Sequence, residues 1–262
     1  MSEVAQWFRG RSRVLFVHAH PDDETITTGG TLAALAEAGL EPLLITLTRG
    51  ERGEVVPGPL QGLVQAHGLA VVRQNELKTA LGMLGLERHV FLGVEPARAE
   101  DHPPTIYEDS GMAWADSVPG EAPRAVPAED VGPDALTSVP AVEVLNDLLA
   151  GVYLSGAQGI VSYDDGGGYG HPDHVLAHQL SRAVATALGL PFWEIVSAPE
   201  DAEAQSEDQV ETHDIAPWLD RKRAALRAYA TQLTVDGEEI VHVGGQRQAI
   251  ETIEQFRLRT LE

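Results

Sequence analysis

The sequence predicts an α/β fold in which helices cover both faces of a mostly parallel β-sheet. Short apolar runs with the character of buried strands alternate with longer segments whose apolar residues recur at helical spacing. Several of these helical segments end at a glycine, which is a common helix C-cap. With 262 residues, 43% of them hydrophobic, the chain is long enough to bury a large core.

The first expected element is the segment Arg13–His18. Its centre is a continuous apolar run, which predicts a buried strand. The Ala/Leu-rich segment Thr27–Ala38 follows it and stops at Gly39, which predicts a helix. The next elements in order are the strand Pro42–Thr48, the helix Leu69–Gly85 and the short strand His89–Gly93.

Residues 94–139 interrupt the alternation with many prolines and acidic residues. Because loops of this length are uncommon without a function, we expect a lid or pocket wall rather than a plain surface loop. The acidic segment Glu200–His213 is expected to be a mobile loop, and the chain after Thr231 to form short strands and a final helical turn. The other elements expected in this half are the helix Val142–Ser155, the strand Gly159–Tyr163, the helix His174–Gly189, the strand Phe192–Ala198 and the helix Pro217–Tyr229.

These elements predict a single, doubly wound, Rossmann-like domain over residues 1–262, with 94–139 as a pocket-forming insert and 235–262 as a divergent tail. In such folds ligands bind beyond the carboxyl ends of the strands. Polar clusters that directly follow a predicted strand are therefore the candidate site residues.

Composition narrows the possible partners and location. The chain has 18 basic and 40 acidic residues, a net charge of −22, and such a surface repels nucleic-acid phosphates. It has no cysteine, no apolar run long enough to span a bilayer and no N-terminal signal pattern. We expect a cytoplasmic protein with a small-molecule substrate and neither nucleic-acid nor membrane partners; the sequence does not select an oligomeric state.

The first polar cluster, residues 18–24, has the sequence His-Ala-His-Pro-Asp-Asp-Glu and follows the first predicted strand. His20 and Asp23 are three residues apart, which suits binding of one metal ion from a tight turn. Asp22 would then lie beside the ion, where a carboxylate can take a proton from water. His18 could support a ligand by a hydrogen bond. The alternative is that the two aspartates only cap the following helix.

The second polar cluster, residues 169–174, has the sequence Tyr-Gly-His-Pro-Asp-His and follows another predicted strand after a glycine-rich loop. This loop lacks the GxGxxG spacing of a dinucleotide site, and the chain lacks a Walker A lysine. The glycines allow Tyr169, His171 and His174 to crowd one pocket. His174 and His178, four residues apart on a helix, are a competing ligand pair, although a packed or exposed His178 is the simpler interpretation.

The paired motifs His20-Pro21-Asp22-Asp23-Glu24 and His171-Pro172-Asp173-His174 resemble those of the LmbE-like/PIG-L family of zinc-dependent N-acetylglucosaminide deacetylases. The resemblance is greatest to the mycothiol biosynthesis branch, which acts on N-acetylglucosaminyl-inositol. It extends from about Arg13 to Gln232 and leaves the tail after Thr234 without a counterpart. Further matching pieces are residues 46–54, Arg73 with Glu76 and Leu77, Asp109 to Met112, residues 168–170 and residues 224–232.

The resemblance implies a role for each candidate residue. One Zn²⁺ per subunit, or Fe²⁺, would be bound by His20, Asp23 and His174. Asp22 would be the general base, and His171, oriented and charged by Asp173, the general acid or electrostatic stabiliser. Tyr169 would help to stabilise the oxyanion, while Arg73 and Asp109 would contact sugar or inositol hydroxyls. The expected reaction is hydrolysis of an acetamide to acetate and a free amine.

Other functions remain possible from the sequence. Related enzymes include the mycothiol S-conjugate amidase and a bacillithiol-type deacetylase that acts on a malate-linked sugar. A metal- or sugar-binding module without catalysis is a non-enzyme alternative, but it would not need both a base and an acid. A nucleotide-binding dehydrogenase is suggested by the predicted fold alone and lacks its glycine motif.

Overall fold

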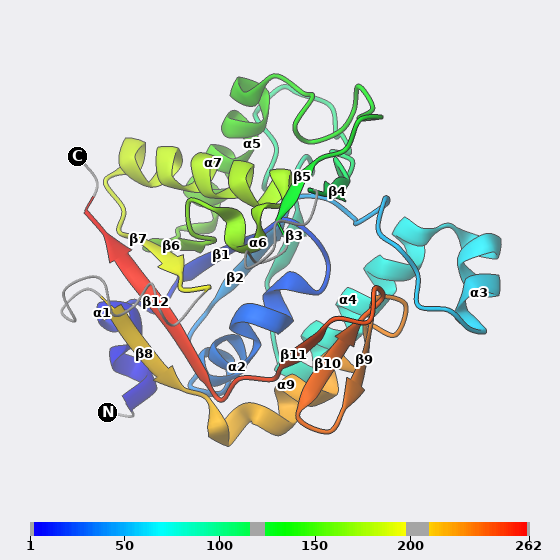
Figure 1. Ribbon diagram of the computed structural model, residues 1–262. Coiled ribbons are helices and arrows are strands. Elements are labelled where there is room, and N and C mark those ends of the chain that lie inside the picture. The colour runs from blue at the N-terminus through cyan, green and yellow to red at the C-terminus, as the bar shows by residue number, and fades with distance from the viewer. Residues whose placement is uncertain (1–2, 116–123, 198–209, 261–262) are drawn as a thin grey trace.

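The structure is a computed structural model, and the residues it describes are 3–115, 124–197 and 210–260. Within these ranges a seven-stranded sheet has the strand order β3-β2-β1-β6-β7-β12-β8 (Figure 1). The first five strands in this order, β3, β2, β1, β6 and β7, are parallel, whereas β12 is antiparallel to both of its neighbours. This arrangement confirms the mostly parallel α/β fold. The bounds are His89–Phe91 (β3), Leu43–Thr46 (β2), Val14–His18 (β1), Gly159–Ser162 (β6), Phe192–Ile195 (β7), Ile253–Arg259 (β12) and Val210–Asp214 (β8).

Helices cover both faces of the sheet, as Figure 1 shows. Successive side chains of a strand point to opposite faces, so Phe16 and Leu15 of β1 belong to two separate apolar cores. Phe16 packs in the core formed with α2 (Asp23–Glu37), α4 (Leu69–Leu84) and α9 (Leu219–Leu226). Leu15 packs in the core formed with α5 (Ala141–Ser155) and α7 (Pro172–Leu188). A continuous apolar strand is therefore what a two-sided fold requires.

The predicted glycine stops are confirmed at helix ends. Gly85 after α4 and Gly189 after α7 have φ values of 77° and 63°, in the left-handed region where a residue without Cβ is favoured. These caps turn the chain back toward the sheet. The segments after them are the strands β3 and β7.

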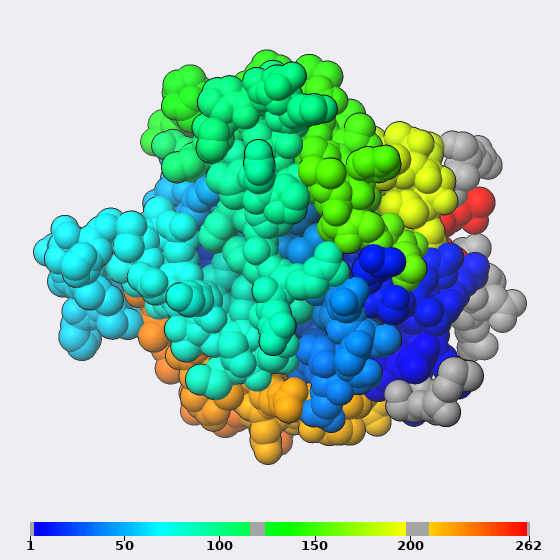
Figure 2. All heavy atoms as spheres, turned by 180° about the vertical axis from the view of Figure 1, so that it is seen from behind, coloured from blue at the N-terminus to red at the C-terminus, as the bar shows by residue number. Residues whose placement is uncertain are grey.

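Several short elements complete the described residues. Helix α3 (Leu60–His67), which the sequence analysis did not predict, stands out from the body of the molecule in Figures 1 and 2 and has no buried residue. The strands β11-β10-β9 form a separate three-stranded sheet. The remaining elements are η1 (Glu3–Gln6), α1 (Trp7–Gly10), β4 (Met112–Trp114), β5 (Ala125–Pro127), α6 (Gly167–Gly170), η3 (Ala216–Trp218), β9 (Leu233–Asp236), β10 (Glu239–His242) and β11 (Arg247–Ala249).

The insert is fixed to the domain through α5. Asp147 of α5 is fully buried and accepts hydrogen bonds of 2.7 Å from Arg98 Nη1 and from the Tyr107 hydroxyl. Farther along the insert, β4 and β5 pair as an antiparallel ribbon. Trp114 of β4 lies 5.9 Å from the ring of Tyr169, between ring centres. These contacts place part of the insert beside the second polar cluster.

Two predictions for the C-terminal region were wrong. The described residues do not finish in a helical turn, because Ile253–Arg259 is strand β12 in the central sheet. Within the expected mobile loop Glu200–His213, residues 210–213 belong to strand β8, and 200–209 lie outside the described residues. Buried charged residues caused the first error: Glu254 and Arg257 are only 4% and 6% exposed, so β12 does not show an apolar strand pattern.

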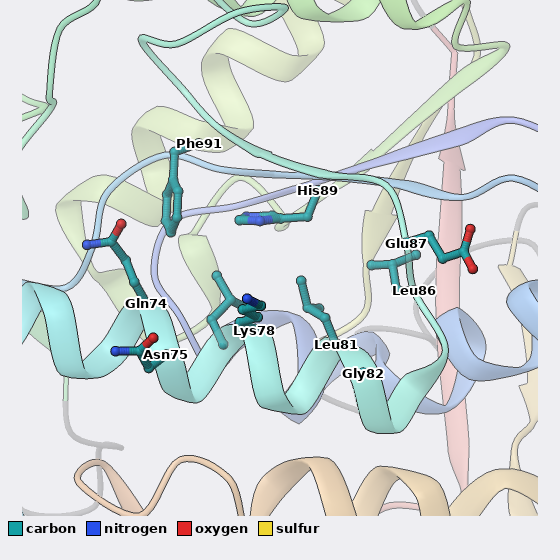
Figure 3. Close-up of a pocket in the computed structure, with 10 residues that line it drawn as sticks. Gln74, Asn75, Lys78, Leu81, Gly82, Leu86, Glu87, His89 and Phe91 are labelled. Atoms are coloured by element: carbon teal, nitrogen blue, oxygen red, sulfur yellow. The ribbon is translucent and has the colours of Figure 1, made fainter.

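A groove of about 480 Å³ lies between α4 and β3, where Gln74, Lys78, His89 and Phe91 are among the side chains that line it (Figure 3). Its lining residues come from α4, from β3 and from the link between them. None of them belongs to the two polar clusters, so the groove is separate from the candidate site.

Glu254 of β12 joins the tail to the rest of the domain. Its carboxylate accepts hydrogen bonds from the backbone N–H groups of Gly30 (2.9 Å) and Thr31 (2.7 Å) and forms an ion pair with Lys222 Nζ (2.8 Å). Both charged side chains are 2% exposed. A buried charge whose partner is removed is strongly destabilising, because it is then left without solvent or a counter-charge.

Replacing Glu254 with alanine is therefore expected to lower the free energy of unfolding by about 3–5 kcal/mol. Denaturant unfolding measures the change. The double variant Glu254→Leu with Lys222→Met removes both charges and should recover the part of the loss that comes from the unpaired Lys222. A Glu254→Ala protein as stable as the parent would contradict the prediction.

Candidate metal centre

The two polar clusters meet because of the sheet topology. Strand β1 ends at His18 and the turn after it leads into α2, while β6 ends at Ser162 and its loop leads into α7. Since β1 and β6 are adjacent and parallel, with Phe16 opposite Val161, both loops leave from the same edge of the sheet. Helix α2, which was predicted over Thr27–Ala38, begins earlier, at Asp23. Asp23 therefore lies in the first turn of this helix.

His20, Asp23 and His174 form a compact set of donor atoms. The distances are 3.2 Å between His20 Nδ1 and His174 Nε2, 3.3 Å between His20 Nδ1 and Asp23 Oδ2, and 3.2 Å between His174 Nε2 and Asp23 Oδ2. Ligands about 2.0–2.1 Å from a tetrahedral ion lie roughly 3.3 Å from one another. The three donor atoms thus have the spacing that a tetrahedral Zn²⁺ site requires.

Neighbouring groups fix the orientation of the two imidazole rings. His174 Nδ1 lies 3.2 Å from the carbonyl oxygen of Gly167, and His20 Nε2 lies 3.1 Å from Asp173 Oδ2. In each ring, one nitrogen bonds an acceptor and the other faces the shared centre. This is the common arrangement around a metal-binding histidine, in which the second nitrogen donates to a carboxylate or carbonyl.

Tyr163 is the site residue that the sequence analysis missed. Its hydroxyl donates to Asp23 Oδ2 (2.7 Å) and accepts from the backbone N–H of Ala19 (2.8 Å), and its ring stacks on His174 at 4.1 Å. The sequence signal for this role was the position of Tyr163, which directly follows β6 at the carboxyl end of the strand. Its side chain links both halves of the centre.

Burial and charge act in opposite directions on the donor groups. Burial by itself disfavours a charged Asp23, but His174 and His20 hold its pKa well below the usual range. Burial likewise opposes a charge on His20, but Asp109, Asp173 and Asp23 hold its pKa well above the usual range. A metal ion binds the neutral ring, so loading of the centre would release this proton.

Asp22 lies next to the donor set but does not belong to it. Burial raises its pKa well above the usual range, the charge of Asp23 adds to this effect and Arg73 opposes it. The Arg73 guanidinium packs on Gly50 and Gly53, where an added Cβ would lie 2.4 Å and 2.1 Å from it.

His171 and Asp173 are also beside the centre, but their contact differs from the expected one. The Asp173 carboxylate bonds His20, and its backbone N–H donates to His171 Nδ1 at 3.2 Å. Burial, together with the charges of His20 and His174, lowers the pKa of His171 to about 3, although Asp173 acts in the opposite direction. The ring is therefore neutral in the protein without bound ions, and the carboxylate supports a donor residue instead.

The structure brings the other predicted site residues close to the centre. Asp109 Oδ1 lies 3.6 Å from His20 Nε2 and accepts from the N–H of Gly111 at 2.7 Å. The half-exposed ring of Tyr169 lies 5.2 Å from His174, between ring centres. Two wider sets also have donor atoms within 4.8 Å of one another: His20, His171 and His174, and His20, Asp109, His171 and Asp173. The set with Asp23 has the shorter, more regular spacing.

Two further histidines, His178 and His18, lie outside the donor set. His178 Nδ1 lies 3.0 Å from the carbonyl oxygen of Tyr163 and 3.7 Å from Glu194 Oε1, so its ring is packed against the protein and not paired with His174. His18 Nε2 pairs with the Thr28 hydroxyl at 3.2 Å rather than with a donor residue. The packed His178 agrees with the simpler interpretation of the sequence, and the expected support of a donor residue by His18 is corrected.

Among the described residues, no helix is long and apolar enough to cross a membrane.

Comparisons with known proteins agree with the geometry. The profile of the PIG-L family, described as GlcNAc-PI de-N-acetylase, matches residues 15–185. The 1D-myo-inositol 2-acetamido-2-deoxy-alpha-D-glucopyranoside deacetylase of Kineococcus radiotolerans is 37% identical, and the match covers 94% of this chain and 77% of that protein.

Two solved structures show the same fold at 20% identity. The N,N'-diacetylchitobiose deacetylase of Pyrococcus horikoshii matches with a TM-score of 0.55 over 87% of this chain and 73% of its own. GalB, the 4-carboxy-2-hydroxymuconate hydratase of Pseudomonas putida, also has a TM-score of 0.55, over 95% of this chain and 98% of its own. The fold therefore occurs with more than one reaction, and the assignment depends on the sequence match. By that match and by its paired histidine motifs, the chain belongs to the PIG-L family.

Proposed function

We propose that this protein is a metal-dependent hydrolase that removes the N-acetyl group from an N-acetylglucosaminide. The observation that carries the proposal is the triangle of His20, Asp23 and His174 donor atoms, 3.2–3.3 Å apart, with Asp22 directly before Asp23 in the chain. By the names of its relatives, the substrate is N-acetylglucosaminyl-inositol, as in mycothiol biosynthesis.

The donor chemistry fits zinc, with one ion per subunit, and it also suits ferrous iron. When bound, such an ion lowers the pKa of a water molecule and polarises the acetyl carbonyl. His20, Asp23 and His174 would bind it. Their supports, Asp173, Gly167 and Tyr163, keep the donor atoms at the required spacing.

The remaining residues of the site would move protons and bind the sugar. Asp22 takes the proton of the attacking water as its oxygen adds to the acetyl carbon. His171, on the side of the second loop, would stabilise the developing charge or, once it has taken up a proton from solvent, give that proton to the nitrogen of the leaving amine, so that acetate and a free amine are formed. The Tyr169 hydroxyl donates to the carbonyl oxygen as negative charge develops there.

Arg73 and Asp109 would recognise hydroxyl groups of the substrate. Arg73 Nη2 donates to the carbonyl oxygen of Glu54 at 3.3 Å, and its buried Nε has no hydrogen-bond partner among the described residues. Asp109 offers a carboxylate at the edge of the same centre. A hydroxyl-rich aglycone such as inositol would satisfy both.

The amidase that cleaves mycothiol S-conjugates and the deacetylase of malate-linked sugars are the alternatives within the same chemistry. A pure binding module is disfavoured because Asp22 and His171 flank the donor set. A cytoplasmic location and a small-molecule substrate stay predictions from the sequence.

The function is tested by acetate release from N-acetylglucosaminyl-inositol, with the malate-linked sugar and a mycothiol S-conjugate assayed side by side. We expect the inositol-linked substrate to react fastest, a chelator to abolish the reaction and added Zn²⁺ to restore it. Hydrolysis that continues in the presence of the chelator would contradict the proposed metal dependence. Preference for either of the other substrates would select the corresponding alternative.

Substitutions of Asp22 and of His174 are expected to impair the enzyme in different ways. Asp22→Asn should retain stoichiometric metal but lose about 10²–10⁴-fold in kcat, because it cannot accept a proton. His174→Ala should instead lose bound metal, since it removes a donor atom. Metal content and acetate release are measured on the same samples. An Asp22→Asn enzyme of near-parental rate, or a His174→Ala enzyme with full metal content, would refute the respective role.

Arg73→Ala is expected to raise KM for the inositol-linked substrate about 10- to 100-fold, the loss typical of a hydrogen bond to a charged group. Simple N-acetylglucosamine should be hardly affected. Arg88→Ala is the matched control, because its guanidinium bonds the carbonyl oxygens of Glu41 and Ser155 near the amino ends of the strands. Equal losses on both substrates would argue against an inositol contact.

A further inference from the structure

The backbone of Asp22 has an unusual conformation. Its φ of 119° and ψ of −34° lie in a region that residues with a side chain rarely adopt, and Asp22 is the N-cap residue of α2. Such a conformation persists only where the surrounding structure enforces it, and it is often found at functional sites. The hydrogen bond made by the Asp22 backbone N–H indicates which residue enforces it here.

Glu24 is the side chain that binds the backbone N–H of Asp22. Its Oε2 accepts from this N–H at 3.2 Å, two residues back along the chain. Glu24 is fully buried, although it is acidic and is not one of the donor residues of the metal centre. A buried carboxylate needs hydrogen-bond donors on its other oxygen as well.

Tyr229 provides such a donor from a distant part of the chain. Its hydroxyl donates to Glu24 Oε1, and the Thr25 hydroxyl donates to the same oxygen. Tyr229 is itself fully buried in the core between α2, α4 and α9. The carboxylate of Glu24 is therefore oriented from one side by Tyr229 and presents its other oxygen to Asp22.

The segment that carries Tyr229 is firmly attached. Thr231 donates to Glu76 of α4 through its backbone N–H and its hydroxyl, each at 2.7 Å. The carbonyl oxygen of Thr231 accepts from the N–H of Val56 at 2.8 Å. Val56 lies in the loop that follows Gly50 and Gly53, the two glycines that contact Arg73. Residues 224–232, which matched the family without an assigned role, thus connect α2, α4 and this loop.

Resting on the proposed role of Asp22, we propose that Tyr229 is a positioning residue that acts through Glu24. By orienting the Glu24 carboxylate, it fixes the amide of Asp22 in its unusual conformation and holds the proton-accepting carboxylate beside the metal centre. Tyr229 does not touch the reacting atoms. Displacement of a catalytic group by about 1 Å can lower a rate 10²-fold, so loss of this contact should act on turnover.

The test uses Tyr229→Phe, which keeps the ring in the core and removes only the hydroxyl. We expect kcat to fall about 10- to 100-fold, while KM and bound metal stay at parental values. Amide hydrogen exchange in the metal-free protein gives a readout independent of activity, and the Asp22 amide should exchange faster in the variant. A parental kcat with unchanged exchange at Asp22 would overturn the proposal.

Tyr107→Phe is the matched control. It too removes a buried tyrosine hydroxyl that donates to a carboxylate, in this case Asp147 on the opposite face of the sheet. It should leave kcat and the Asp22 amide unchanged. Equal loss of kcat in both variants would show a general effect of destabilisation and would overturn the positioning role.

Glu24→Gln provides a second, independent test, because its amide replaces a carboxylate oxygen with a donor group. If Tyr229 acts through Glu24, the double variant with Tyr229→Phe should be no slower than Glu24→Gln alone. Multiplicative losses in kcat would contradict this route. Should the parent protein release no acetate, the proposed function fails, whereas the exchange of the Asp22 amide still decides the positioning role.

Discussion

The pairing of β1 with β6 is the constraint on which the candidate site depends. These two parallel strands are adjacent in the sheet but separated by more than half of the sequence, and the segments after them carry one donor histidine each, His20 in the turn before α2 and His174 in the first turn of α7. A helix starts after each loop, so the donor residues occupy turns and helix N-termini rather than free loops. Tyr163 then ties Asp23 to His174, and the 3.2–3.3 Å spacing follows from the strand order.

Much of this could be predicted from the sequence because the signals were local. Apolar runs predicted the parallel strands, glycines predicted the helix ends, and the two histidine motifs predicted which loops meet. Long-range polar contacts could not be predicted in this way. The role of Tyr163 depends on a partner 140 residues away, and the carboxylate of Asp173 bonds His20 rather than the nearby His171. Strand β12 was missed because Glu254, buried by its pairing with Lys222, looks like a surface residue in the sequence.

Buried carboxylates recur as organising groups in this acidic protein. Glu254 accepts from the backbone of α2, Glu76 from the backbone and hydroxyl of Thr231, and Glu24 from the backbone of Asp22. Glu254 and Glu76 bond N–H groups of segments that are distant in the sequence. Glu24 bonds the N–H of Asp22, whose backbone conformation is unusual. Hydrogen bonds to charged groups are stronger than neutral ones, and a buried acceptor is costly to leave unpaired. Part of the acidity therefore serves internal geometry.

The outer strands of the central sheet have a further consequence for solution behaviour. In the described part of the chain, one outer strand is β3, of only three residues, and the other is β8, which carries Glu211 and Asp214. Unpaired backbone groups at a long, flat edge invite another chain to add to the sheet, and short or charged edges discourage it. With a net charge of −22, neighbouring molecules also repel one another. The same strand arrangement that assembles the site thus guards a concentrated protein against edge-to-edge aggregation.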